Sequence, residues 1–148
     1  MILDWELEAP FRLYARLQGP LSVSERWLTY CELAEICRDQ HVSQLMIDHG
    51  GAPLAEGERV YFHQHDPISR LFLLADIMEV AIIRSDLTAQ RGRARKAFAN
   101  VQIMASNFET RLNARRWLDR TWQASEEFTA LVISHAANRV GPGKGRRS

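Results

Sequence analysis

The sequence predicts an α/β domain built on a mostly parallel sheet of four to five strands. The expected sheet has an antiparallel strand at its N-terminal edge. The helices pack mainly on one face of the sheet, and a further helix follows at the C-terminus. Two observations predict this fold class. Apolar and polar residues alternate over 4–22, on both sides of Ala9-Pro10, which is typical of an antiparallel hairpin. Farther along, short apolar runs alternate with helical periodicity, which is typical of parallel strands joined by right-handed helical crossovers.

The segment after the hairpin predicts a helix followed by a buried strand. Ser22 and Glu25 have the spacing of a capping box, in which the serine side chain bonds the glutamate amide. The helix then runs to about Asp39, because apolar residues recur there at intervals of three and four. Residues 44–48 form the next strand, which ends in a carboxylate, a histidine and two glycines.

The second half of the chain repeats this alternation. Asp66 caps a helix that begins at Pro67 and runs through Ala75, while 55–63 suits either a helix or a strand. The later elements are a strand at 78–84, a helix opening at 85–88, a strand at 101–106, a helix at 108–118 and a last helix at about 123–139. We expect one domain over 1–139 and a disordered, basic tail over 140–148.

Composition narrows the class of protein. The 148 residues are 46% apolar and 25% charged, which excludes general disorder and suffices for one buried core. No apolar run approaches the roughly 18 residues of a membrane span, and the N-terminus lacks the features of a signal peptide, so we expect a cytoplasmic protein. Cys31 and Cys37 project about 240° apart on one helix, which predicts neither a disulfide nor a zinc site.

Charge is unevenly distributed along the chain. Residues 1–66 carry 5 arginines and 11 acids, whereas residues 67–148 carry 14 basic residues and 7 acids. If the two basic helices pack side by side, their arginines form a surface for an anionic partner, such as an acidic protein or phospholipid headgroups; the alternative is a solvated helix face. No aromatic residues interleave with them, so we do not expect nucleic acid as a partner. The arginines of this surface are Arg91, Arg95, Arg111, Arg115 and Arg116.

Two motifs near the end of the domain resemble those of a known family. A G-x-x-R pattern in a small-residue helix is followed by a strand and then by F-x-[DT]-x-x-x-A-x-x-W-L. With the order of elements over about 3–120, these motifs resemble the SpoIIAA-like (STAS-like) family of small bacterial proteins. The residues that carry the resemblance are Gly92, Arg95, Phe108, Thr110, Ala114, Trp117 and Leu118.

The resemblance implies a non-enzymatic interaction or regulatory domain. In the anti-sigma factor antagonists of this family, a kinase phosphorylates a serine at the helix that follows the central strand. The matching segment here has no hydroxyl side chain between Asp48 and Tyr61, so it lacks that switch. We therefore interpret Asp48 as a loop or cap carboxylate and Gly50-Gly51 as a turn, and we expect a protein partner of unknown pathway.

Two alternatives to an interaction domain remain open, a ligand-binding protein and a metal-dependent enzyme. Ligands often collect at strand ends, so Asp48, His49, Gly50, Gly51 and Tyr61 are candidate ligand-binding residues. Because the family also resembles the CRAL-TRIO lipid-transfer fold, a small apolar or lipid-like ligand is the second hypothesis. Its wall residues, which core packing explains equally well, are Trp5, Tyr61, Phe62, Phe72 and Leu73.

A metal-dependent enzyme is the last hypothesis. His63 and His65 are weak metal candidates beside Asp66, which the helix cap already explains. The sequence contains no nucleophile elbow, dinucleotide fingerprint or Walker loop, so we expect neither an enzyme nor a cofactor. We expect the chain to form a homodimer, because an apolar stripe on the last helix must either cover the sheet or pack on a second subunit. The stripe consists of Phe128, Leu131, Val132 and His135.

Overall fold

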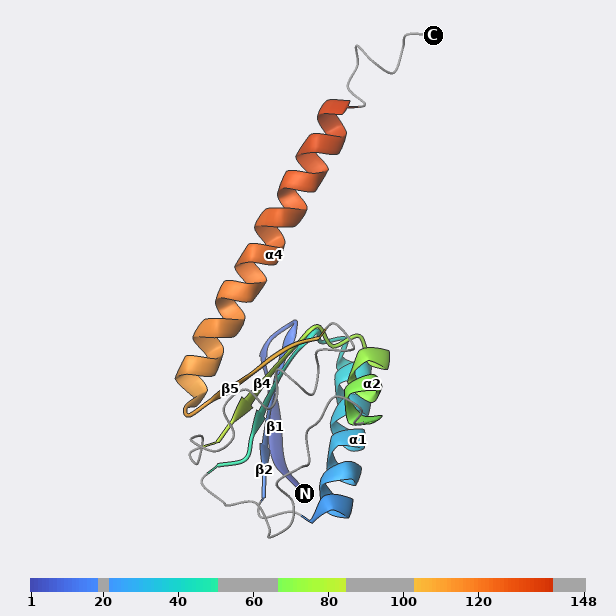
Figure 1. The fold of residues 1–148 in the computed structure, drawn as a ribbon, viewed down its shortest axis with the longest axis vertical. Coiled ribbons are helices and arrows are strands. Elements are labelled where there is room, and N and C mark those ends of the chain that lie inside the picture. Colours follow the sequence, from blue (N-terminus) through green and yellow to red (C-terminus); the bar gives the residue numbers. More distant parts are fainter. Residues whose placement is uncertain (19–21, 51–66, 85–102, 140–148) are drawn as a thin grey trace. The chain divides into compact units, whose positions relative to one another are not determined.

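The computed structural model describes residues 1–18, 22–50, 67–84 and 103–139 and has an α/β fold with a five-stranded mixed sheet (Figure 1). The chain divides into two compact units, residues 1–115 and 116–148. In chain order the described elements are β1 (Ile2–Ala9), β2 (Arg12–Leu17), α1 (Val23–Gln40), β3 (Gln44–Asp48), α2 (Pro67–Leu74), β4 (Glu79–Ile83), β5 (Met104–Phe108) and α4 (Arg111–Arg139).

The sheet has the strand order β1-β2-β3-β4-β5. β1 pairs antiparallel with β2, and every later pair is parallel, so the predicted antiparallel edge and mostly parallel sheet are confirmed. β5 lies slightly later than the predicted strand at 101–106. The predicted elements within 51–66 and 85–102 lie outside the described residues.

Local sequence fixes both ends of α1. The Ser22 hydroxyl accepts the Glu25 N–H at 3.2 Å, and the Glu25 carboxylate accepts the Ser22 N–H at 3.2 Å, which confirms the predicted capping box. At the other end, His41 adopts a left-handed conformation with φ of 56°, and its N–H donates to the Arg38 carbonyl. This cap turns the chain directly into β3.

The core lies between α1, α2 and one face of the sheet. Alternate residues of each strand point to this face, because successive side chains of a strand project to opposite sides. Phe72 is fully buried and stacks on Tyr30 with ring centroids 5.7 Å apart, whereas Leu73 is exposed. Cys31 and Cys37 are free thiols. The strand residues of the core are Leu13, Ala15, Leu17, Leu45, Ile47, Val80, Ile82 and Ala105, and Ile103 joins them just before β5.

The helix α4 is continuous from Arg111 to Arg139, so the prediction of two separate helices is wrong. No glycine or proline interrupts this stretch, and Ser125, close to the start of the predicted last helix, lies inside α4, where its carbonyl accepts the Thr129 hydroxyl at 2.9 Å. Thr110 does cap the helix: its hydroxyl accepts the Asn113 N–H at 3.2 Å. Within the described residues, no helix is long and apolar enough to cross a membrane.

Truncation of a core side chain tests this packing. We expect Leu45→Ala to lower the free energy of unfolding by about 2–5 kcal/mol, because Leu45 is fully buried and its loss leaves a cavity. Leu74→Ala, at an exposed position of α2, is the control and should change it by less than about 0.5 kcal/mol. Urea denaturation followed by circular dichroism measures both, and equal effects would contradict the assigned core.

Candidate functional site

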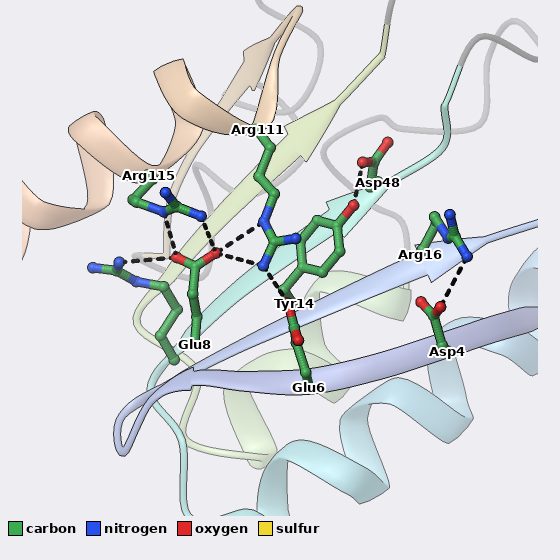
Figure 2. A network of polar contacts seen from close by, with 9 residues as sticks. Asp4, Glu6, Glu8, Tyr14, Arg16, Asp48, Arg111 and Arg115 are labelled. Carbon is green, nitrogen blue, oxygen red and sulfur yellow. Dashed lines mark hydrogen bonds and ion pairs between the residues drawn. The ribbon is translucent and has the colours of Figure 1, made fainter.

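The second face of the sheet carries mostly polar side chains over β1, β2 and β3, together with the buried Met46. Even-numbered residues of β1 and β2 share this face, since Asp4 pairs with Arg16 and Glu6 with Tyr14 in the ladder. The first turns of α4 add two arginines (Figure 2). We call this set the charged face, and it consists of Asp4, Glu6, Glu8, Arg12, Tyr14, Arg16, Asp48, Arg111 and Arg115.

Glu8 is the centre of the charged face, and its side chain is only 11% exposed. One carboxylate oxygen accepts hydrogen bonds from Arg12 at 3.2 Å and Arg115 at 3.1 Å. The other accepts from Arg111 at 3.0 Å and again from Arg115 at 3.1 Å. Burial raises the pKa of Glu8, but the hydrogen bonds from Arg115, Arg111 and Arg12 outweigh it, so the pKa lies below its ordinary value.

Tyr14 joins the start of α4 to the end of β3. The Arg111 guanidinium lies 3.5 Å from the centroid of the Tyr14 ring, and the Tyr14 hydroxyl donates to Asp48 at 2.5 Å (Figure 2). Asp48 also accepts the Gly50 N–H at 2.7 Å, and Gly50 has φ of +64°, as expected for a glycine turn. Burial and then the hydrogen bond to Asp48 raise the pKa of Tyr14 to about 12. Tyr14 is therefore a hydrogen-bond donor, not a base, near neutral pH.

A hollow of about 280 Å³ opens beside this network. Its walls carry both signs of charge: Asp4 and Arg16 form an exposed ion pair at 2.9 Å, and Glu6 pairs with Arg111 at 2.5 Å. Such a mixed wall suits a polar side chain better than an apolar ligand. The lining residues are Asp4, Trp5, Glu6, Tyr14, Arg16 and Arg111.

His49 lies in the interior, where its Nε2 is 2.8 Å from the Tyr30 hydroxyl. Its backbone N–H donates to the Ile83 carbonyl at 2.9 Å. Burial, followed by the positive charges of Arg26 and Arg84, holds the pKa of His49 well below its ordinary value. The ring is therefore neutral near physiological pH and belongs to the packed end of β3.

The structure brings together only part of the predicted ligand set. Asp48 and Gly50 meet in one turn, and His49 points into the interior; Gly51, Tyr61, Phe62, His63 and His65 lie outside the described residues. Of the proposed lipid-site wall, Phe72 belongs to the core and Trp5 is 40% exposed. Within 1–18, 22–50, 67–84 and 103–139, no group of three or more histidine, cysteine or acidic side chains is placed to hold a metal.

Two of the predicted surface arginines form internal ion pairs. Arg111 bonds Glu6 and Glu8, and Arg115 bonds Glu8, whereas Arg116 is exposed. Arg91 and Arg95 lie outside the described residues. A surface for an anionic partner therefore stays a prediction.

Glu8 and Tyr14 are the important residues that sequence reasoning missed. The acids of β1 recur at every second position, and this pattern could have predicted an acidic row on one face of the hairpin. Their basic partners on α4 are 103 and 107 positions away from Glu8, and no local spacing predicts that contact.

Comparisons of the chain with protein-family models, with curated proteins and with solved structures give no match. The geometry of the described residues is therefore the basis for inferring function.

The charge cluster around Glu8 predicts a loss of stability in acid. The folded pKa of Glu8 lies below its ordinary value of 4.5, so its contribution is complete above that pH and is lost as pH falls through the folded pKa. We expect Glu8→Gln to lower the free energy of unfolding by about 1–3 kcal/mol at pH 7, because it removes the carboxylate from three arginines. The variant should also lose part of the wild-type pH dependence below 4.5.

Asp4→Asn is the matched control for this prediction. Asp4 forms one exposed ion pair, so its loss should cost less than about 1 kcal/mol. Urea denaturation between pH 3 and pH 7 measures all three proteins, and a Glu8→Gln variant with the wild-type pH dependence would contradict the assignment.

The buried His49 ring predicts a loss of stability in a second, higher pH range. Its folded pKa lies well below 6.5, so the unfolded chain binds the extra proton first and stability falls as pH drops below about 6.5. We expect His49→Gln to flatten the dependence of the free energy of unfolding between pH 7.5 and pH 5. NMR titration of the wild-type ring should show no protonation over the same range; protonation near pH 6.5 would overturn the buried, neutral state.

Proposed function

We propose that this chain is a non-enzymatic interaction domain with a SpoIIAA-like fold that associates with a second copy through α4. The observation that carries the proposal is the exposed apolar surface of that helix. All residues from 123 to 139 are exposed, and Phe128 and Leu131 are 67% and 69% exposed. Contiguous exposed apolar side chains on a helix typically mark a contact surface. We call Phe128, Leu131, Val132 and His135, the stripe expected from the sequence, the α4 stripe.

The charges that flank the α4 stripe favour antiparallel pairing of two copies. Glu126 and Glu127 precede the stripe, and Arg139 follows it. When two helices cross between Leu131 and Val132, Glu127 lies opposite position 136, about 4.5 Å along the axis from Arg139 of the other copy. Parallel pairing would instead place like charges side by side, so the sequence fits the antiparallel arrangement better.

The arrangement of elements supports a SpoIIAA-like identity. The antiparallel edge strand and the order of alternating strands and helices match the expectation from that family. Phe108 ends β5, Thr110 caps α4 and Ala114 is buried, which gives three motif residues a structural role. Because 49–60 contains no hydroxyl side chain, we do not extend the proposal to the serine phosphoswitch.

The contacts of the candidate proton-transfer groups favour binding over catalysis. Tyr14 donates to Asp48 and has a raised pKa, and Glu8 is held ionised by three arginines. His49 is neutral, buried and bonded to Tyr30. General acid–base work requires a group with a pKa near the working pH and access to substrate. None of these three side chains meets both conditions.

Substitutions that introduce or reverse a charge on α4 test the proposed association. We expect the wild-type chain to dimerise and Leu131→Glu to weaken the dimer at least about tenfold, because the variant places a carboxylate in the apolar contact. Glu127→Lys should also weaken it, and the double variant Glu127→Lys/Arg139→Glu should restore it. Analytical ultracentrifugation over a concentration series measures each dissociation constant.

Leu74→Glu is the control, because Leu74 is exposed on α2 and lies outside the α4 stripe. It should dimerise like the wild type. A wild-type chain that stays monomeric at the highest concentration, or a Leu131→Glu variant that dimerises fully, would contradict the proposal.

A further inference from the structure

The edge strand β1 offers a second surface, which is independent of α4. Its eight residues lie at one end of the strand order, and among the described residues it pairs only with β2. The ladder with β2 is regular from Asp4 to Leu7, between two irregularities in register. In an antiparallel pair, every second residue directs its N–H and C=O away from the partner strand. β1 can therefore pair with another strand on its outer side.

The side chains of β1 form an exposed apolar row. Trp5 and Leu7 pair with the buried residues Ala15 and Leu13, so they lie on the core face of the sheet. They are nevertheless 40% and 45% exposed, and the neighbouring Leu3 is 51% exposed. Charged side chains often protect an edge strand, but β1 carries its charges, Asp4, Glu6 and Glu8, only on the opposite face. An exposed apolar row beside an open strand edge instead suits the apolar side chains of an added strand.

On its other face β1 contributes acidic side chains, of which Asp4 and Glu6 each pair with one arginine of a neighbouring element. The side chains of Asp4 and Glu6 are 56% and 60% exposed and line the hollow beside Arg16 and Arg111 (Figure 2). A lysine or arginine on an added strand would reach these carboxylates from the open side of the strand. Charge complementarity therefore favours basic residues on this face of the partner strand.

We propose that β1 binds an extended strand of a partner protein in which apolar and basic residues alternate. The apolar residues pack beside Trp5 and Leu7, and the basic residues face Asp4 and Glu6. The backbone supplies affinity through new ladder hydrogen bonds, and the two rows of side chains supply specificity. A second copy of β1 fits poorly, because self-pairing would place the acidic rows of both copies on one face.

A model peptide tests this inference on the full chain. The probe is a fluorescein-labelled octapeptide in which lysine and valine alternate, and fluorescence anisotropy at physiological salt measures its dissociation constant. We expect it to bind at least about tenfold more tightly than a peptide of four lysines followed by four valines. N-methylation at alternate residues removes the donors of one strand edge, so it should weaken binding at least about tenfold.

Variants and hydrogen exchange locate the bound peptide. Trp5→Lys should weaken binding at least about tenfold, while Leu74→Lys, at an exposed position of α2, should leave it unchanged. Circular dichroism confirms that both variants fold. Hydrogen exchange should show new protection of amides within residues 4–7 and none in β5. The inference would be overturned if the peptide of four lysines and four valines bound equally well, if Trp5→Lys left binding unchanged, or if β5 became protected. If the chain instead dimerised without peptide and Trp5→Lys abolished the dimer, the edge of β1 would be assigned to a second copy.

Discussion

The Glu8 carboxylate is the interaction on which the second face of the sheet depends. It receives hydrogen bonds from Arg12 on β2 and from Arg111 and Arg115 on α4, so one acid joins elements that are over a hundred residues apart. The Arg12 side chain is only 4% exposed, and its guanidinium would be costly to bury without an anion. With Glu8 in place, Arg111 also pairs with Glu6 and lies over the Tyr14 ring. The polar face is therefore held together by mutual neutralisation.

The two faces of the sheet are stabilised by different kinds of interaction. Leu45 and its neighbours pack against α1 and α2, where non-directional burial of apolar surface dominates. On the opposite face, Tyr14, Asp48 and the arginines depend on directional bonds that constrain where each group lies. The first arrangement stabilises the fold, and the second leaves acidic and basic side chains at the surface. The two contact surfaces that we propose, the edge of β1 and α4, both lie outside the apolar core.

The elements that the sequence predicted correctly are those defined by local patterns. The hairpin alternation, the Ser22–Glu25 box and the apolar run at β3 each depend on residues within a few positions of one another. The break between the predicted helices at 108–118 and about 123–139 is wrong, because no glycine or proline interrupts the stretch and the backbone stays helical through it. The Glu8 cluster could not be predicted, since its partners meet only after the sheet has formed and α4 has followed β5.

The contacts of Arg111 limit which substitutions this position can tolerate over evolutionary time. Its guanidinium stacks on Tyr14 while its N–H groups bond two carboxylates, and only a flat, forked cation satisfies both demands. A lysine at this position, with a single ammonium group, would lose part of these contacts. Arg16, with one exposed partner, has no such demand and can vary. Sequence drift on this surface is thus limited by molecular shape at one arginine and by little more than charge at another.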